Sequence, residues 1–272
     1  MKVSCVCCTY GRFAILGRSL ACWLYQDFPD SELIIYNTSP IPLQLHNKLR
    51  GFPIKVFNRS VNANGLPYSS LGEIRREALQ QATGNIYVCW DDDDLFLPWH
   101  ISQGMQHILK ENKVAWMPEQ SYFSYDGGKI YKHATNSMEA SVLVSIREVL
   151  KYGFSNESGS EHLPWRRGLV DAEKLDEHCS VTPFESYAYI WGEPLAPHKT
   201  SGDLRNPLNF ENHKKYSDDF GEGKLLVPWA KERIDQYFIN IQASFPSIKL
   251  QERFDYYLKK HCPPILMQDW NN

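Results

Sequence analysis

The sequence predicts an α/β fold in which helices flank a mostly parallel sheet. Over roughly the first 110 residues, short β-prone apolar runs alternate with segments of helical period, and each run ends in polar turn residues. Strands that alternate with helices are joined by crossover connections, which place neighbouring strands parallel and helices on both faces. At 272 residues the chain can bury a full core, as one large α/β domain or as two small ones.

The predicted elements follow one another at short intervals. In chain order they are a strand over 3–8, a helix over 12–27, strands over 32–37 and 54–58, a helix over 70–84, a strand over 85–90 and a helix over roughly 98–112. The helix over 70–84 has a serine start and a glycine stop, and Pro98 suits a first helical turn. Further along, the predicted elements are a strand and a short helix over 140–154, a tyrosine-rich strand early in 182–203, and helices over 225–262 interrupted by Pro246.

Composition is that of an ordinary soluble protein, with 43% hydrophobic residues, 22% charged residues and a net charge of -3. This balance gives no global electrostatic case for nucleic-acid binding. The seven cysteines include no two CxxC pairs, and three of them lie in the first apolar run, which favours core positions over zinc or disulfides. We find no secretory signal and no apolar run of about 18 residues, so a cytoplasmic protein without a transmembrane segment is expected.

Four consecutive aspartates, Asp91–Asp94, follow the predicted strand 85–90 directly. In open parallel sheets ligands bind at the carboxyl ends of the strands, so this acidic run should lie at the binding edge with Thr9, Asn37 and Asn58. Carboxylate clusters suit a hard divalent cation, Mg²⁺ or Mn²⁺, that keeps open positions for substrate phosphates. The alternative is a solvated acidic turn that caps the next helix, because aspartate is stabilised near a helix N-terminus.

Several segments together resemble the family 2 glycosyltransferases of the GT-A fold. They are VSCVCCTYGR (3–12), QDFPDSE (26–32), the Ala82-Thr83-Gly84 turn and YVCWDDDD (87–94). The resemblance covers roughly residues 2–110 and implies a Rossmann-like domain that binds a nucleotide-diphosphate sugar. It places Asp91 and Asp93 on the family's Asp-x-Asp motif, with Asp93 as the favoured direct ligand of Mn²⁺ or Mg²⁺ and Asp92 or Asp94 in support.

The resemblance also implies a nucleotide pocket. Thr9, Tyr10 and Arg12 stand at first-loop positions that contact base, ribose and pyrophosphate, and Arg75 stands at the family's helix arginine. Asn37 replaces an aspartate that commonly binds uracil, so a UDP-sugar donor is favoured but other bases stay open. The alternatives are that Asn37 is a turn former and Arg75 a solvated side chain.

Two further positions correspond to family motifs in the second half. Glu161-His162 stands where the family usually has Glu-Asp with a general base, and either residue can deprotonate an acceptor hydroxyl. His198 stands in a loop that in several members supplies an extra metal ligand. The alternatives are a helix-starting glutamate beside an incidental histidine, and a solvated loop histidine.

We therefore expect a metal-dependent, inverting glycosyltransferase, with a GT-A domain over 1–205 and a mainly helical extension over 206–272. Within that domain, 1–110 would bind the nucleotide sugar and 111–205 the acceptor. The acceptor would be a cell-envelope glycan or a hydroxymethylated DNA base, in a bacterial cell or in a phage host. The alternative is a nucleotidyltransferase, or a nucleotide-sugar binding protein without turnover.

The C-terminal segment 225–262 is expected to pack on the catalytic domain or on a second subunit, which leaves an oligomer open. Aromatic residues are abundant, and such side chains either fill the core or stack on sugars and bases. Those that we single out are Trp99, Trp116, Tyr122, Tyr125, Tyr131 and Trp165.

Overall fold

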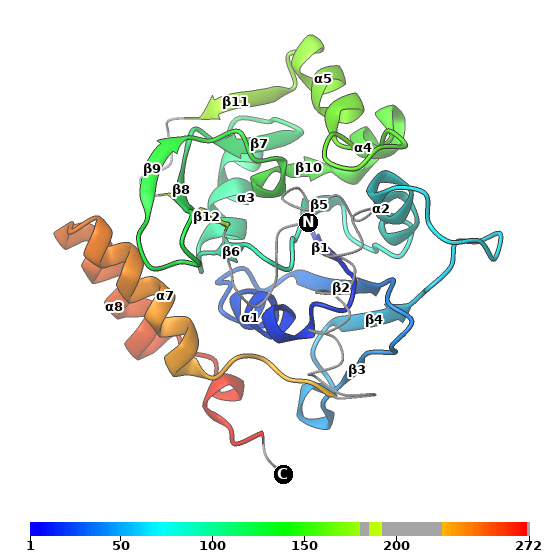
Figure 1. Ribbon diagram of the computed structural model, residues 1–272. Helices are drawn as coiled ribbons and strands as arrows, with labels where there is room; N and C mark the ends of the chain where they lie inside the picture. Colours follow the sequence, from blue (N-terminus) through cyan, green and yellow to red (C-terminus); the bar gives the residue numbers. More distant parts are fainter. Residues whose placement is uncertain (180–184, 192–224, 271–272) are drawn as a thin grey trace.

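A seven-stranded sheet forms the centre of the computed structural model, which describes residues 1–179, 185–191 and 225–270 (Figure 1). Its strand order is β11-β7-β10-β5-β1-β2-β4. The strands are β1 (Val3–Thr9), β2 (Ser31–Asn37), β4 (Ile54–Asn58), β5 (Ile86–Cys89), β7 (Ala115–Pro118), β10 (Leu143–Ser145) and β11 (Leu175–Cys179). All neighbours are parallel except β10, which runs antiparallel to both β5 and β7. The predicted mostly parallel sheet is confirmed.

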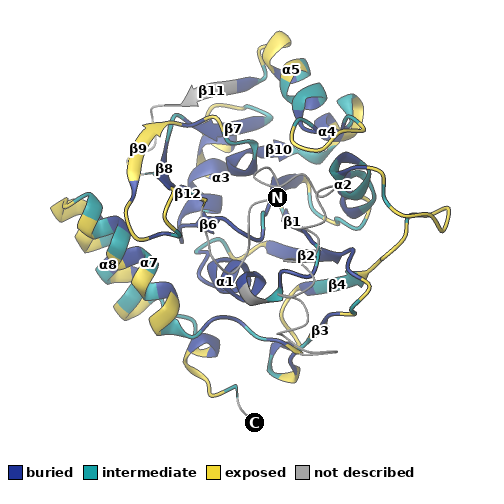
Figure 2. Ribbon diagram, in the orientation of Figure 1, coloured by how far each residue is buried: buried dark blue, intermediate teal, exposed yellow. Residues whose placement is uncertain are grey.

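The central strands are apolar along their whole length because other elements cover both of their faces. Every residue of β1 and β2 is buried, which is the pattern of strands inside a parallel sheet (Figure 2). Cys5, Cys7 and Cys8 belong to this core, and all three are free thiols, as the sequence predicted.

Helices connect and flank the strands. They are α1 (Phe13–Leu24), α2 (Leu71–Leu79), α3 (His100–Lys110), α4 (Ile146–Tyr152) and α5 (Leu163–Asp171). The start of α2 is capped by side chains: the Ser70 hydroxyl accepts from the Glu73 amide, and the Glu73 carboxylate accepts from the Ser69 amide. The helix predicted over 70–84 therefore begins as expected, but it ends five residues earlier, at Leu79.

A smaller four-stranded sheet adjoins the acidic run. Its order is β6 (Leu95–Phe96), β12 (Tyr187–Ile190), β8 (Gln120–Ser124) and β9 (Lys132–Thr135). A two-stranded ribbon joins β3 (Gln44–Leu45) to β13 (Leu225–Leu226), and short 3-10 turns span Asn47–Leu49, Glu139–Ser141 and Pro264–Met267. Because β6 begins directly after Asp94, this second sheet ties the acidic run to β12.

Two C-terminal helices, α7 (Lys231–Ser244) and α8 (Ile248–Lys260), lie side by side and break near Pro246, as predicted (Figure 1). They pack on the first half of the chain: Phe238 contacts Tyr25, directly after α1, and Phe254 contacts Trp99, with ring centroids 5.6 and 5.4 Å apart. Their outer faces are exposed (Figure 2). Within the described ranges, no helix has the length and apolar character needed to cross a bilayer.

Candidate active site

The carboxyl ends of three parallel strands meet at one edge of the sheet. Thr9 pairs with Asn37 and Asn37 with Asn58 in the strand registers. The Asn37 side-chain amide donates to Asn58 Oδ1 at 2.8 Å, and the Thr38 backbone amide donates to the Thr9 carbonyl at 3.0 Å. The predicted gathering of strand ends is confirmed, and the acidic run follows β5 at the same edge.

Arg12 neutralises the middle of the acidic run. Asp92 and Asp93 are buried, and the Arg12 guanidinium binds both carboxylates, reaching Asp93 Oδ2 at 2.5 Å. The Thr9 hydroxyl donates to Asp92 at 2.6 Å. Burial alone would lower the pKa of Arg12, but the adjacent carboxylates outweigh burial and raise it. Arg12 is therefore always charged, which allows two adjacent aspartates to stay buried at one strand end.

Asp94 is bound by two residues of β12. Its carboxyl accepts from the Tyr187 hydroxyl and, at 3.2 Å, from the Ile190 amide of β12. Burial, then the neighbouring Asp93 and Asp91, raise the pKa of Asp94 well above its usual value. Through these two bonds Asp94 fastens β12 to the acidic run.

Arg75 joins the acidic run to the loop before α5. Its Nη2 donates to Asp91 Oδ1 and its Nε to Glu161 Oε1, both at 2.9 Å, and Nη1 contacts the Cys89 thiol. The side chain is buried, so the solvated alternative for Arg75 is wrong. One guanidinium thus holds together two carboxylates that lie far apart in the sequence.

Glu161 and His162 form a buried pair beside Arg75. His162 Nε2 lies 3.4 Å from Glu161 Oε1 and 4.0 Å from the Cys89 sulfur, and the Gly159 amide donates to Glu161 Oε2 at 2.8 Å. Burial, then the Arg75 charge, lower the pKa of His162 well below its usual value. The imidazole is therefore neutral at neutral pH, which is the state that a base requires.

The structure brings together most of the residues predicted from the sequence. Thr9 and Arg12 surround Asp92 and Asp93, while Arg75, Glu161 and His162 surround Asp91. Tyr10, which directly follows Thr9 in the sequence, is half-buried. His198 lies outside the described residues.

Asn37 is fully buried, and its side chain is engaged locally. Its amide donates to Asn58 and to the Ile41 carbonyl, and its carbonyl oxygen accepts from the Ser39 amide at 3.1 Å. These bonds form the turn that the alternative interpretation anticipated.

Two residues of the site were missed by the sequence reasoning. Cys89 is the last residue of β5 and lies between Arg75 and Asp91, 3.3 Å from Asp91 Oδ1. Tyr187 binds Asp94 from the tyrosine-rich strand. A cysteine at the end of a predicted strand resembles an ordinary core residue, so no sequence pattern distinguished Cys89 as part of the site.

The residues fit a divalent cation at Asp91. The Asp91 side chain is 27% exposed, and its bonds to Arg75 and Cys89 both end on Oδ1. Carboxylate oxygen is the ligand type that Mg²⁺ and Mn²⁺ prefer, with phosphate oxygens and water as the remaining ligands. Over the part of the chain that the structure describes, no cluster of three or more potential protein ligands occurs.

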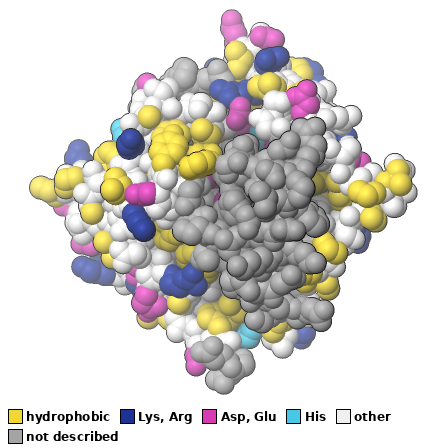
Figure 3. All heavy atoms as spheres, in the orientation of Figure 1, with side chains coloured by type: hydrophobic (Ala, Val, Ile, Leu, Met, Phe, Trp, Pro, Cys, Tyr) yellow, Lys and Arg dark blue, Asp and Glu magenta, His cyan; other side chains and the backbone are white. Residues whose placement is uncertain are grey.

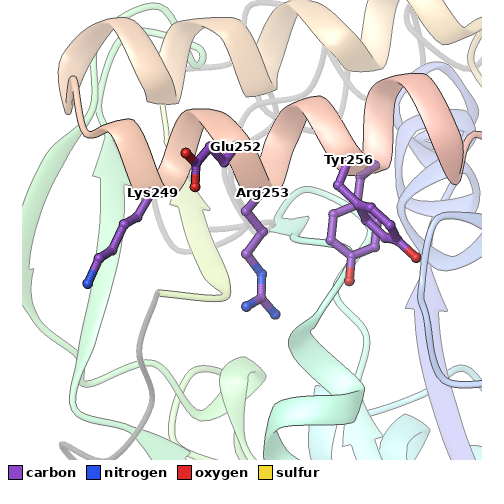
Figure 4. Close-up of a pocket in the computed structure, with 5 residues that line it drawn as sticks. Lys249, Glu252, Arg253 and Tyr256 are labelled. Atoms are coloured by element: carbon purple, nitrogen blue, oxygen red, sulfur yellow. The ribbon is translucent and has the colours of Figure 1, made fainter.

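A separate recess of about 580 Å³ lies along α8, away from the predicted site residues (Figure 4). Its lining comes from one helix: Lys249, Glu252, Arg253, Tyr256 and Tyr257. Arg253 lies over the Trp99 ring, 4.5 Å from its centroid, and so helps to hold α8 on the core. We assign this recess no part in the chemistry.

The sheet order, the acidic run after β5 and the facing carboxylate–histidine pair define the class of the GT-A nucleotide-sugar fold. The model of Glycosyl transferase family 2 matches residues 4–167, more than half of the chain, and the chain belongs to this family. It is therefore a glycosyltransferase, as the sequence predicted. The match extends beyond the roughly 110 residues that carried the resemblance and includes Glu161 and His162.

Solved structures of similar fold include three of S. aureus TarS 1-349. The complex with UDP-GlcNAc has a TM-score of 0.58 at 16% identity, covering 98% of this chain and 84% of that chain. The complex with UDP has a TM-score of 0.54 at 14% identity, covering 98% of this chain and 83% of that chain. A further TarS 1-349 structure has a TM-score of 0.54 at 13% identity, with the same coverage of both chains. At these identities the likeness concerns the fold. No curated protein matches the chain significantly.

Proposed function

We propose that the chain transfers a sugar from a nucleotide-diphosphate sugar, with UDP favoured as the nucleotide, to an acceptor hydroxyl. The observation that carries this proposal is the double contact of Arg75 with Asp91 and Glu161, both at 2.9 Å. Arg75 holds Asp91, a carboxylate suited to binding the donor, close to Glu161, a candidate base. A direct displacement requires donor and base to be held close together. Family membership supports the reaction type, and the similar fold of a UDP-GlcNAc complex supports the donor.

Asp91 and Asp93 would hold Mn²⁺ or Mg²⁺ with the donor diphosphate, and His198 would add a ligand. A cation held there would supply positive charge to neutralise the leaving diphosphate. Thr9, Tyr10 and Arg12 would contact base, ribose and diphosphate, and Asp92 would keep Arg12 in place. Asn37 would contact the base only after giving up one of its turn bonds.

Glu161 or His162 takes the proton of the acceptor hydroxyl. The acceptor oxygen then bonds to the anomeric carbon from the face opposite the diphosphate, and the bond from that carbon to the diphosphate oxygen breaks. The products are a glycoside of inverted configuration and a nucleoside diphosphate. The acceptor is a glycan hydroxyl or the hydroxymethyl group of a modified DNA base, and free thiols at the described core cysteines support a cytoplasmic enzyme.

The test is release of nucleoside diphosphate from a panel of UDP-, GDP- and dTDP-sugars, with and without Mn²⁺. We expect Mn²⁺-dependent release from a UDP-sugar, and loss of it on the order of 10²-fold in Asp91→Asn, the equivalent of about 2.7 kcal/mol. The matched control is Asp30→Asn, because Asp30 is an exposed aspartate at the other end of the sheet, paired with the N-terminus at 3.7 Å.

Two results would contradict the proposal. Release of pyrophosphate from nucleoside triphosphates would identify a nucleotidyltransferase instead. Equal UDP binding by Asp91→Asn and by the parent, with and without Mn²⁺, would remove Asp91 from the donor site.

A further inference from the structure

We propose that Tyr125 and Trp191 form a platform on which a sugar ring of a glycan acceptor stacks. The inference deepens the proposed function and rests on it, because a stacking surface near the acidic run matters only if transfer takes place there. Nothing in the sequence motifs distinguished these two aromatic residues from the others.

Exposure separates Tyr125 from the other aromatic residues singled out in the sequence. Trp99, Trp116, Tyr122, Tyr131 and Trp165 are buried, whereas Tyr125 is 58% exposed. Its partner Trp191 is 38% exposed, and their ring centroids lie 6.4 Å apart. Hydrophobic side chains gather on the surface over β8 and β12 (Figure 3). Exposed aromatic side chains that cluster in this way mark binding sites more often than chance.

The backbone under the two rings is fixed. Ser124 pairs with Ile190 in the parallel β8–β12 ladder, and Tyr125 and Trp191 follow directly. The Trp191 amide donates to the Ser124 carbonyl at 2.8 Å, and the Gly127 amide donates to the Trp191 carbonyl at 3.2 Å. In the adjoining turn, Asp126 Oδ1 accepts from two backbone amides. A platform held in this way loses little conformational freedom when a ligand binds.

The platform continues a row of aromatic side chains along β12. Tyr187, Tyr189 and Trp191 alternate along the strand and therefore point to one face. Tyr187 binds Asp94, Tyr189 contacts Phe123 at 6.1 Å between centroids, and Trp191 contacts Tyr125. β12 runs antiparallel to β6 and approaches the acidic run toward its end, where the Ile190 amide donates to Asp94 Oδ1 at 3.2 Å. Trp191 directly follows Ile190, so a glycan stacked on Trp191 would lie beside the acidic run.

The geometry favours a sugar over a nucleic-acid base. The two ring planes meet at 58°, which makes an open trough and not the parallel faces between which a flat base is sandwiched. A sugar ring presents apolar C–H groups to an aromatic face, while the tyrosine hydroxyl and the indole N–H can bond to its hydroxyls. The occupant is thus a glycan, which selects one of the two proposed acceptor classes.

Fluorine NMR of the full chain labelled with fluorotryptophan tests the platform. The Trp191 signal is assigned with Trp191→Phe, and UDP with Mg²⁺ fills the donor site. Chitotetraose, maltotetraose and an oligonucleotide containing hydroxymethylcytosine are then added separately. We expect at least one oligosaccharide to shift the Trp191 signal to saturation, and Tyr125→Ala to weaken that binding about tenfold. The control is Tyr256→Ala, which removes a comparably exposed tyrosine from α8 and should change nothing.

The outcomes separate this inference from the proposed function. Failure of every UDP-, GDP- and dTDP-nucleotide to bind would overturn the proposed function itself. If UDP binds but neither oligosaccharide shifts the Trp191 signal, the platform is overturned alone. A shift by the oligonucleotide only, or by UDP only, would also overturn it, because the rings would then serve a base.

Discussion

At the scale of single residues, two arginines explain how four adjacent aspartates share one strand end. Close like charges repel by about 1 kcal/mol per pair even in water. Arg12 pairs with Asp92 and Asp93, Arg75 pairs with Asp91, and Asp94 is held by β12. The protein therefore compensates the acidic run internally, and a cation that binds Asp93 has to compete with Arg12.

Replacing Arg12 by Gln should show this competition. The variant leaves Asp92 and Asp93 buried without their guanidinium, and we expect a loss of about 3–5 kcal/mol in the free energy of unfolding. Mg²⁺ without nucleotide should restore part of the thermal stability of the variant and leave that of the parent unchanged. Arg12→Lys keeps the charge and serves as the control. Equal stabilisation of parent and Arg12→Gln by Mg²⁺ would show that Arg12 and the cation do not compete.

Replacing Glu161 by Gln and His162 by Asn should identify the base. One variant should lose on the order of 10²-fold in turnover while keeping its nucleotide affinity. Burial and Arg75 lower the pKa of His162, so its neutral form persists as the pH falls through its ordinary value of about 6.5. Turnover of the parent should therefore survive at pH 6 if His162 is the base. Normal turnover by both variants would place the base elsewhere.

The sequence predicted the members of the site better than their pairings. Thr9 and the acidic run were found because strand ends meet at one edge of a parallel sheet. The contact of Arg75 with Glu161 spans 86 residues, and no local pattern encodes such a distance. The turn bonds of Asn37 likewise depend on Asn58, on a strand that is neighbouring only after folding.

At the scale of elements, the close approach of α2 to the loop before α5 sets the distance between Arg75 and Glu161. The Gly72 amide donates to the Glu157 carbonyl at 3.1 Å, and the Leu71 amide donates to the Ser158 hydroxyl at 3.0 Å. A Cβ at Gly72 would lie 1.8 Å from the Ser155 carbonyl oxygen. Only glycine allows this helix start and this loop to touch.

Gly72→Ala should therefore move the loop away from α2. We expect a loss of about 1–3 kcal/mol in stability from the steric clash, and a fall in turnover of up to roughly 10²-fold, because Glu161 and His162 shift relative to Asp91. Circular dichroism and the nucleotide-release assay measure the two effects. Gln80→Ala, at the exposed end of the same helix, is the control. Parental turnover in Gly72→Ala would mean that the loop position does not matter.

The longer elements of the first 110 residues were predicted, whereas the two-residue strands were not. β1, β2, β4, β5, α1 and α3 lie within a few residues of their predicted ranges. β3 and β6 have two residues each, too few to show a period, and the antiparallel direction of β10 leaves no mark in its sequence. Gly84 was interpreted as the stop of a helix. Its observed role is a close approach to β1, where a Cβ would lie 2.7 Å from the Lys2 carbonyl oxygen.

At the scale of the whole molecule, the C-terminal helices complete the core of the catalytic half. Phe254 is fully buried between Trp99 and Phe238, and the Tyr257 hydroxyl donates to Asp27 at 2.5 Å. These contacts join the end of the chain to its first helix and the turn that follows. α7 and α8 therefore share one interface with the described part of the first half of the chain.

Phe254→Ala should destabilise the molecule as a unit. Removing a buried aromatic ring costs about 3–5 kcal/mol, and we expect a single thermal transition at lower temperature, detected alike by calorimetry and by nucleotide binding. Ile248→Ala, at a position 80% exposed on the same helix, should leave the transition unchanged. A separate early transition in Phe254→Ala would show that the C-terminal helices unfold independently.

The bond between Tyr257 and Asp27 has a consequence for protein synthesis. Its two residues are 230 positions apart, and a ribosome adds roughly 5–20 residues per second, so about 12–46 s separate their synthesis. During that interval the surface that α7 and α8 will cover is apolar and open on the nascent chain. Exposed apolar surface on an incomplete chain favours aggregation, and it is also what chaperones recognise. Production of this enzyme should therefore improve when chaperones are supplied together with it, measured as the yield of soluble protein.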